Sequence, residues 1–302
     1  MKREIQSKKE AWLHAVRLRT LPLALASIFA GSFLAQWQGS FRWEVLLLAS
    51  LTTIFLQILS NLANDYGDSI HGADSSERKG PIRAVQSGLI SLQEMKRAMV
   101  LFGALSLGTG ILLIYLALPD WKYFLGFLAL GLAAIWAAIR YTSGKNPYGY
   151  AGLGDIFVFG FFGIVGVTGT YFLHALEANP LILLIAFSLG CFSTVVLNIN
   201  NIRDIDSDRL AGKLSIPVRI GRMNAIRYHW ALILLGNVSL LYFVLLNQTY
   251  TPLLAFLMLP WMIQISQGIQ SATTAAETDP FLKKMALSTL IWTLLFGFGL
   301  IL

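Results

Sequence analysis

Long apolar stretches separated by short polar breaks run along almost the whole chain. Nine of these stretches approach the roughly 20 residues that a helix needs to cross the hydrocarbon core of a bilayer. The breaks between them contain proline, asparagine and glycine, which tend to end helices. The pattern therefore predicts nine membrane-spanning helices, at roughly 20–38, 43–64, 95–118, 121–140, 150–173, 180–200, 228–247, 251–268 and 285–302.

The amino-acid composition agrees with a chain that lies mostly in the bilayer. Hydrophobic residues make up 56% of the 302 positions, charged residues make up 13%, and the mean hydropathy is +0.63. These values lie outside the usual balance of a soluble globular protein. Two connections differ from the others because they are long, polar and densely charged, at about 65–97 and 201–227. We therefore predict an all-α integral membrane bundle that forms a single domain, residues 1–302.

The distribution of positive charge predicts the orientation of the chain. The net charge is +7, but Lys and Arg lie in the connections rather than along one amphipathic face, which argues against nucleic acid as a partner. When nine spans alternate across the membrane, every Lys and Arg except Arg42 and Lys122 falls on one side. Because positive connections tend to stay cytoplasmic, we expect a cytoplasmic N-terminus, two cytoplasmic long connections and a C-terminus on the opposite side.

A weak internal repeat appears when the chain is shifted by 136 residues. The pairs that match are Asn64 and Asn200, Asp68 and Asp204, Pro81 and Pro217, and Arg83 and Arg219. Four matches alone are also compatible with chance. Both copies, however, follow an apolar span and open a long connection, so two related halves, about 20–140 and 150–270, would place similar sites face to face.

Two clusters rich in Asn and Asp begin these long connections. The first reads SNLANDYGDSIHGAD and contains Asn64, Asp68 and Asp74, and the second reads NINNIRDIDSD. In the second cluster Asn200, Asp204 and Asp208 recur every four residues, which places them on one face of a helix. Carboxylates beside hydrocarbon are costly and usually mark a functional cavity, and oxygen ligands suit Mg²⁺ shared with substrate phosphates. The alternative is that these residues only cap helices and form turns in solvated loops.

Basic residues follow each acidic cluster. We select Arg83, Lys213 and Arg219 as candidates to contact diphosphate oxygens and to stabilise the charge of a departing diphosphate. Arg140 and Lys145, after the fourth span, would close the same cavity from another side. The tendency of positive residues to remain cytoplasmic explains the same charges equally well.

Asp155 is an isolated carboxylate in the apolar segment GLGDIFVFGFFG. A carboxylate within a membrane span suggests a functional role, and here it could orient or deprotonate an aromatic hydroxyl. The alternative is a buried carboxyl group that is hydrogen-bonded to Tyr or Ser.

Several segments together resemble the UbiA superfamily of intramembrane aromatic prenyltransferases. These segments are RLRTLPLALA (17–26), SNLANDYGDSIHGAD (60–74), GPIRAVQSGLIS (80–91), NPYGYAGLGD (146–155) and VLNINNIRDIDSDRLAGK (196–213). The resemblance implies a nine-helix bundle whose second and sixth helices carry the Asn/Asp motifs around a central cavity open to the cytoplasm. The chain departs from the superfamily motif at one position. The third acid of the first motif would fall at position 72, where this chain has Gly72, and Asp74 follows two residues later. That shift resembles the branch that prenylates 1,4-dihydroxy-2-naphthoate.

The resemblance also implies a reaction, its ligands and its location. Mg²⁺ would be bound by Asn64, Asp68, Asp74, Asn200, Asp204 and Asp208, and the diphosphate by Arg83, Lys213 and neighbouring cations. An all-trans polyprenyl group would pass from its diphosphate to 1,4-dihydroxy-2-naphthoate with loss of CO₂, giving demethylmenaquinol for menaquinone synthesis. The enzyme would lie among the lipids of the bacterial inner membrane.

Two other functions remain open at the level of sequence. One is a UbiA-type enzyme with another acceptor, such as 4-hydroxybenzoate, homogentisate or haem. The other is a cation-coupled transporter, which also combines internal repeats with intramembrane acids. Transporter sites usually lie near the bilayer midplane, whereas both acidic clusters here lie at helix ends on one predicted side.

Overall fold

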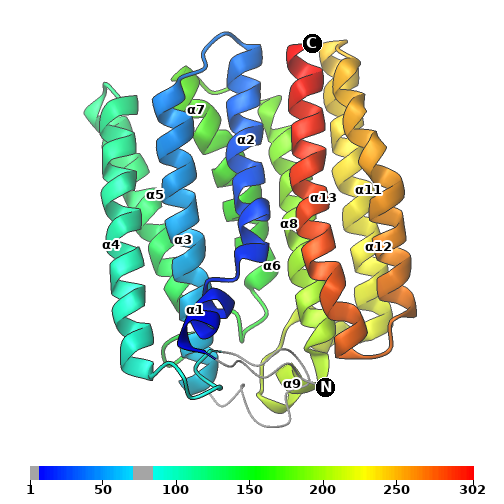
Figure 1. Cartoon of the computed structure of the whole chain (residues 1–302). Helices are drawn as coiled ribbons and strands as arrows, with labels where there is room; N and C mark the ends of the chain where they lie inside the picture. The colour runs from blue at the N-terminus through cyan, green and yellow to red at the C-terminus, as the bar shows by residue number, and fades with distance from the viewer. Residues whose placement is uncertain (1–6, 71–83) are drawn as a thin grey trace.

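The computed structural model describes residues 7–70 and 84–302, and these residues form only helices and connections. Nine helical segments in this part of the chain are long and apolar enough to cross a membrane, which confirms the predicted all-α, multi-pass membrane bundle. They stand side by side (Figure 1). The segments are Lys8–Trp37, Trp43–Ile70, Leu92–Ala117, Trp121–Arg140, Gly154–Ala175, Ile182–Arg203, Arg222–Asn247, Thr251–Ser271 and Ala275–Ile301.

Some spans are single helices and others combine several elements. The single helices are α3 (Trp43–Ile70), α4 (Leu92–Ala117), α5 (Trp121–Arg140), α8 (Ile182–Arg203), α11 (Arg222–Asn247) and α13 (Ala275–Ile301). The first span combines α1 (Lys8–Val16), η1 (Leu18–Thr20) and α2 (Leu21–Trp37). It bends at Arg17, whose backbone has a positive φ of 51°. The fifth span combines α6 (Gly154–Val158), η2 (Phe159–Gly169) and α7 (Thr170–Ala175), and the eighth combines η3 (Thr251–Met258) and α12 (Leu259–Ser271).

The middle of the fifth span, η2, is π-helical and has glycine at every third position, from Gly160 to Gly169. A Cβ atom at Gly163 would lie 2.5 Å from the Cα atom of Gly190 in α8, and one at Gly166 would lie 2.9 Å from Cβ of Ser27 in α2. Side chains at these two glycines would therefore prevent η2 from packing closely on both helices. π-Helical turns are rare and often occur at functional sites.

The helices that carry the acidic clusters extend further than the hydropathy pattern predicts. Helix α3 continues to Ile70 and α8 to Arg203, while α11 already begins at Arg222. The second connection contains two short helices, α9 (Ile205–Leu210) and α10 (Ile216–Ile220). Polar residues lower the hydropathy at these positions, but they do not interrupt the helical backbone. The first cluster therefore begins inside a helix.

The predicted connection between the spans at 251–268 and 285–302 is too long, because Pro280 lies inside α13. The helix begins earlier, at Ala275, where Thr274 and Glu277 form a capping box. A proline disfavours a helix interior because it lacks an N–H and clashes with the carbonyl four residues before it. Here the cap fixes the helix start ahead of the proline. As a result Asp279 is held on α13, facing the end of α8.

Buried apolar residues form clusters on two sides of the bundle. One cluster joins α2, α8, α11, α12 and α13 through large side chains that include Phe192, Trp292 and Phe296. Another joins α1, α3 and α4 around Leu59, Leu62 and Met95. In Figure 1 the α3–α5 group and the α8–α13 group stand on opposite sides, with α2 and α6 between them.

Candidate active site

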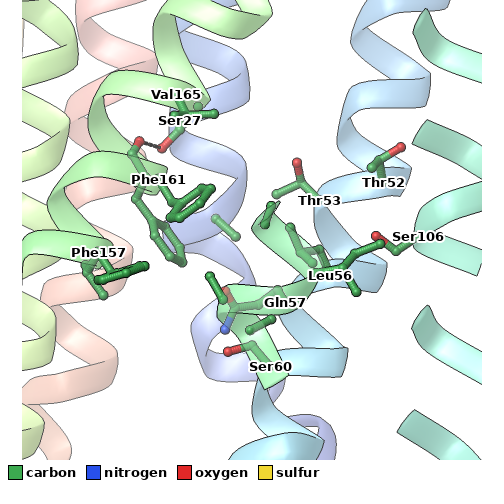
Figure 2. Close-up of a pocket in the computed structure, with 18 of the residues that line it drawn as sticks. Ser27, Thr52, Thr53, Leu56, Gln57, Ser60, Ser106, Phe157, Phe161 and Val165 are labelled. Atoms are coloured by element: carbon green, nitrogen blue, oxygen red, sulfur yellow. Dashed lines mark hydrogen bonds between the residues drawn. The ribbon is translucent and has the colours of Figure 1, made fainter. Parts of the chain in front are cut away.

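A cavity of about 380 Å³ lies within the bundle, lined by α2, α3, α4, α5, the fifth span and α8. Asn64, Asp68, Asn200 and Lys213 line one end of it. Much of the remaining wall is apolar and includes Ile28, Leu113, Ile114, Phe127, Leu128 and Leu173. Figure 2 shows part of this wall, where rings from the fifth span lie on one side and side chains of α3 lie on the other. The cavity thus joins a polar, charged end to an apolar interior.

The first acidic cluster is held by the connection that follows α5. The hydroxyl of Tyr150 donates a hydrogen bond of 3.0 Å to a carboxylate oxygen of Asp68. Thr142 donates to the side-chain oxygen of Asn64 at 3.3 Å and to the carbonyl of Ala63 at 3.0 Å. Because Asn64 and Asp68 are one helical turn apart on α3, both side chains point to the same end of the cavity.

The second cluster lies where α8 ends and α9 begins. The guanidinium of Arg203 donates to both carboxylate oxygens of Asp204, at 2.8 and 2.6 Å, and to the side-chain oxygen of Asn200 at 2.8 Å. Its third nitrogen donates to Asp279 of α13 at 2.6 Å. This buried cation therefore fixes two of the predicted ligand residues and ties them to the last span.

Asp208 and Lys213 form a buried ion pair beside this cluster. Lys213 Nζ lies 3.3 Å from one oxygen of Asp208, and Ser215 donates to the other oxygen at 3.3 Å. Burial raises the pKa of Asp208, Lys213 opposes that rise, and the negative charges of Asp204 and Asp68 add to it. Burial lowers the pKa of Lys213, but Asp208 and the other nearby acidic groups raise it by more. The pKa of Lys213 is therefore above its usual value. The two clusters thus act on one another across the bundle.

Three predicted cations lie away from the cavity lining in the described part of the chain. Arg219 is exposed and donates to the carbonyls of Leu214 and Ala151, at 2.9 and 2.6 Å, so it ties two connections together. Lys145 is exposed, and Arg140 lies against Gly144. Their predicted contacts with diphosphate stay predictions.

Asp155, the predicted intramembrane carboxylate, lies in the first turn of α6 and is buried. It accepts a hydrogen bond of 3.1 Å from the hydroxyl of Tyr228 on α11. This contact matches the alternative reading of Asp155, a buried carboxyl group that is hydrogen-bonded to Tyr. That Asp155 orients or deprotonates the hydroxyl of the aromatic acceptor stays a prediction. Arg83 and Asp74 lie outside the described residues.

Sequence reasoning missed a group of polar residues from the first span and α3. Arg17, Thr20 and Gln57 line the cavity beside Asn61 of the first cluster, and Arg17 also pairs with Asp65. We counted Arg17 only as a charge that sets the topology. A usable signal was available, because Gln57 is a large polar side chain in an otherwise apolar span, and such residues usually face a protein interior.

The donor atoms at the charged end suit Mg²⁺ that is shared with a diphosphate. Within residues 7–70 and 84–302, no three His, Cys, Asp or Glu side chains form a closed metal site. Mg²⁺ is commonly held by only one or two carboxylates, with phosphate and water oxygens completing its coordination. Carboxylate and amide oxygens from two helices, with a lysine beside them, fit that form of binding.

Comparison with curated proteins identifies relatives over nearly the whole chain. The 1,4-dihydroxy-2-naphthoate octaprenyltransferase of Escherichia coli (strain K12) is 43% identical over 98% of this chain and 96% of its own length. The protein of the same name from Haemophilus influenzae (strain ATCC 51907 / DSM 11121 / KW20 / Rd) is 41% identical over 99% and 98%.

Solved structures with the same fold are more distant in sequence. A UbiA homolog from Aeropyrum pernix K1 superposes with a TM-score of 0.66 at 19% identity, over 94% of this chain and 98% of that one. A UbiA homolog from Archaeoglobus fulgidus bound to GPP and Mg²⁺ gives 0.65 at 17% identity, over 96% and 99%. The sequence pattern of the UbiA prenyltransferase family matches residues 24–300. The chain therefore belongs to the UbiA prenyltransferase family, as its Asn/Asp motifs predicted.

Proposed function

We propose that this protein transfers an all-trans polyprenyl group from polyprenyl diphosphate to 1,4-dihydroxy-2-naphthoate. The products are demethylmenaquinol, CO₂ and diphosphate, and the reaction belongs to menaquinone synthesis. The observation that carries this proposal is a cavity that joins Asn64, Asp68, Asn200 and Lys213 to an apolar interior. The names of the relatives from E. coli and H. influenzae support the choice of acceptor.

The charged end binds the diphosphate. Asn64, Asp68, Asn200, Asp204 and Asp208 would hold Mg²⁺, together with Asp74 from outside the described residues. Bound to these residues, Mg²⁺ would neutralise diphosphate charge and so favour the departure of the diphosphate. Lys213 is buried at the cavity wall, where its ammonium group can donate to diphosphate oxygens. Arg83, also outside the described residues, is proposed to do the same.

The reaction breaks one carbon–oxygen bond and one carbon–carbon bond and forms one new carbon–carbon bond. The allylic C–O bond breaks, and its electron pair leaves with the diphosphate. The ring carbon that bears the carboxylate bonds to the allylic carbon. That carboxylate then leaves as CO₂, and the electron pair of the broken C–C bond restores the aromatic ring. Lys213 balances the growing charge, while apolar walls such as Ile114 and Phe127 exclude water and hold the prenyl tail.

A substrate assay with purified protein tests this function. We expect Mg²⁺, a polyprenyl diphosphate and 1,4-dihydroxy-2-naphthoate to give prenylated quinol and CO₂ in equal amounts. 4-Hydroxybenzoate and homogentisate should give little product under the same conditions. Turnover of either of these acceptors without turnover of the naphthoate would contradict the choice of acceptor. Cation flux into liposomes without any prenyl transfer would favour the transporter alternative.

The protein would lie in the bacterial inner membrane with the charged end of the cavity on the cytoplasmic side. This orientation rests on the position of Lys and Arg, since only Arg42 and Lys122 fall on the opposite side of nine alternating spans. A reporter enzyme that is active only outside the cytoplasm should therefore be active when fused after Leu302. Activity of the same reporter at the N-terminus, and not at the C-terminus, would reverse the orientation.

A further inference from the structure

A second pair of polar side chains lies deeper in the cavity than the acidic clusters. Gln57 on α3 and Ser193 on α8 both line the cavity, and each lies seven residues before the asparagine of its motif, Asn64 or Asn200. At a rise of 1.5 Å per residue this places them about 10 Å deeper along each helix. The same shift of 136 residues relates Gln57 to Ser193 and Asn64 to Asn200. The two halves of the bundle thus carry a polar position at matching depth.

The orientation of the Gln57 amide is fixed by its neighbours. Its nitrogen donates to Thr20 Oγ1 and to Asn61 Oδ1, both at 3.2 Å. Thr20 uses its own hydrogen on the carbonyl of Arg17, so its oxygen must accept. Asn61 donates through its nitrogen to the carbonyl of Val16, so its oxygen faces Gln57. Its carbonyl oxygen makes no hydrogen bond to any residue within 7–70 and 84–302, so it can accept one from a ligand in the cavity.

Unlike the Gln57 amide, which is held by two hydrogen bonds, the hydroxyl of Ser193 is buried without a hydrogen-bond partner among the described residues. The residue is 0% exposed, and its oxygen makes no hydrogen bond to any residue that the structure describes. A buried hydroxyl without a partner costs free energy and calls for a specific explanation. Because the oxygen itself has no exposed surface, the hydroxyl has to rotate about χ1 toward the cavity before a ligand oxygen can supply the missing partner.

Aromatic rings form the wall that faces this part of α3. Phe157 and Phe161 line the cavity from the fifth span, and Figure 2 shows both rings on the side opposite Gln57. A flat aromatic ring can stack on such a wall while its edge makes hydrogen bonds. An uncharged site of this kind suits neither a diphosphate nor a purely apolar prenyl tail.

We infer that Gln57 and Ser193 bind the oxygen substituents of the aromatic acceptor, with the ring against Phe157 and Phe161. Gln57 accepts a hydrogen bond from the ring hydroxyl at position 4, and Ser193 donates to the oxygen at position 1, on the opposite edge of the ring. This assignment rests on the proposed function and adds the residues that select the acceptor. Two oxygens at opposite ring positions, as in a 1,4-dihydroxy aromatic acid, can reach α3 and α8 at once.

Ser193→Ala separates recognition from structure. Removing an unpaired buried hydroxyl should leave the melting temperature of the ligand-free protein unchanged or higher. The same change should weaken acceptor binding about tenfold, because one hydrogen bond to the ligand is lost, and should leave the KM for the prenyl diphosphate unchanged. Unchanged acceptor affinity in Ser193→Ala would overturn its assignment.

For Gln57, a comparison of two acceptors isolates recognition from packing. Dissociation constants are measured for 1,4-dihydroxy-2-naphthoate and for 1-hydroxy-2-naphthoate, which lacks one hydroxyl, with wild type and Gln57→Met. Wild type should favour the dihydroxy compound, and Gln57→Met should lose most of that preference. Thr52→Val is the matched control on the same helix and cavity, because the Thr52 hydroxyl is already bonded to Thr109 at 3.0 Å. It should keep the wild-type preference.

The possible failures can be told apart. If Gln57→Met weakens both acceptors equally, the side chain only supports packing and the inference is wrong. If wild type binds neither naphthoate but binds another aromatic acid, the proposed acceptor is wrong. The same comparison, made with that acid and its deoxy analogue, then decides whether Gln57 recognises a hydroxyl.

Discussion

Asp68→Asn is expected to lower the rate of prenyl transfer by about a thousandfold or more while the protein remains folded. The substitution keeps the size of the side chain, and an amide oxygen can still accept the hydrogen bond from Tyr150. What is lost is one negative charge at the end of the cavity where Asn64, Asn200 and Lys213 also lie. In the proposed function, metal binding at the diphosphate depends on that charge, so the loss would fall on the bond-breaking step. The measurement is the initial rate at saturating substrates, together with thermal unfolding in detergent.

Asp206→Asn is the matched control for this change. Asp206 belongs to the second acidic cluster by sequence, but it is exposed on α9 and does not line the cavity. The same chemical change there should alter the rate by less than about twofold. If Asp68→Asn kept more than about a tenth of the wild-type rate, the carboxylate would not be a metal ligand. Excess Mg²⁺ should restore part of the lost rate if weakened metal binding is the cause.

The helices and the two clusters could be predicted because their signals are local. Apolar runs of membrane length fix the spans, and the four-residue spacing of Asn64 and Asp68 fixes their common face once α3 continues to Ile70. The contact between Arg203 and Asp279 joins residues 76 positions apart on α8 and α13. No periodicity carries that information, because the contact depends on how two distant helices pack. The hydropathy pattern even placed Asp279 in a connection, between the spans predicted at 251–268 and 285–302, and not on a helix.

The two basic candidates of the second connection, Lys213 and Arg219, lie in different places because of how the chain folds around them. Lys213 and Arg219 follow the same cluster and appear equivalent in sequence. A turn at Gly212, whose φ is +71°, brings the backbone N–H of Lys213 within 2.8 Å of the carbonyl of Asp208. The Lys213 side chain is then buried at the cavity wall. Arg219 instead binds the carbonyl of Ala151 in a different connection. Composition predicts the positive charge, while the turn decides which residue faces the cavity.

Arg203→Met is expected to lower the free energy of unfolding by about 3–5 kcal/mol, the usual cost of breaking a buried ion pair from one side. Arg203 is 7% exposed and bonds to Asp204, Asn200 and Asp279, so its loss leaves two carboxylates without this cation. Asp279→Asn alone should cost much less, because Arg203 keeps both bonds to Asp204. The measurement is the melting temperature of the four proteins of a double-mutant cycle in detergent.

The double variant Arg203→Met/Asp279→Asn should lose less stability than the sum of the two single losses, because each single change already removes the ion pair between Arg203 and Asp279. Prenyl transfer should remain low in the double variant, since Asp204 still lacks the guanidinium that holds both of its oxygens. A smaller loss of stability than this sum, without recovery of transfer, would mean that Arg203 has two separable roles, one joining α8 to α13 and one orienting Asp204. Strictly additive losses of stability would show instead that Arg203 and Asp279 are not coupled, and the link between the last span and the site would then have to be abandoned.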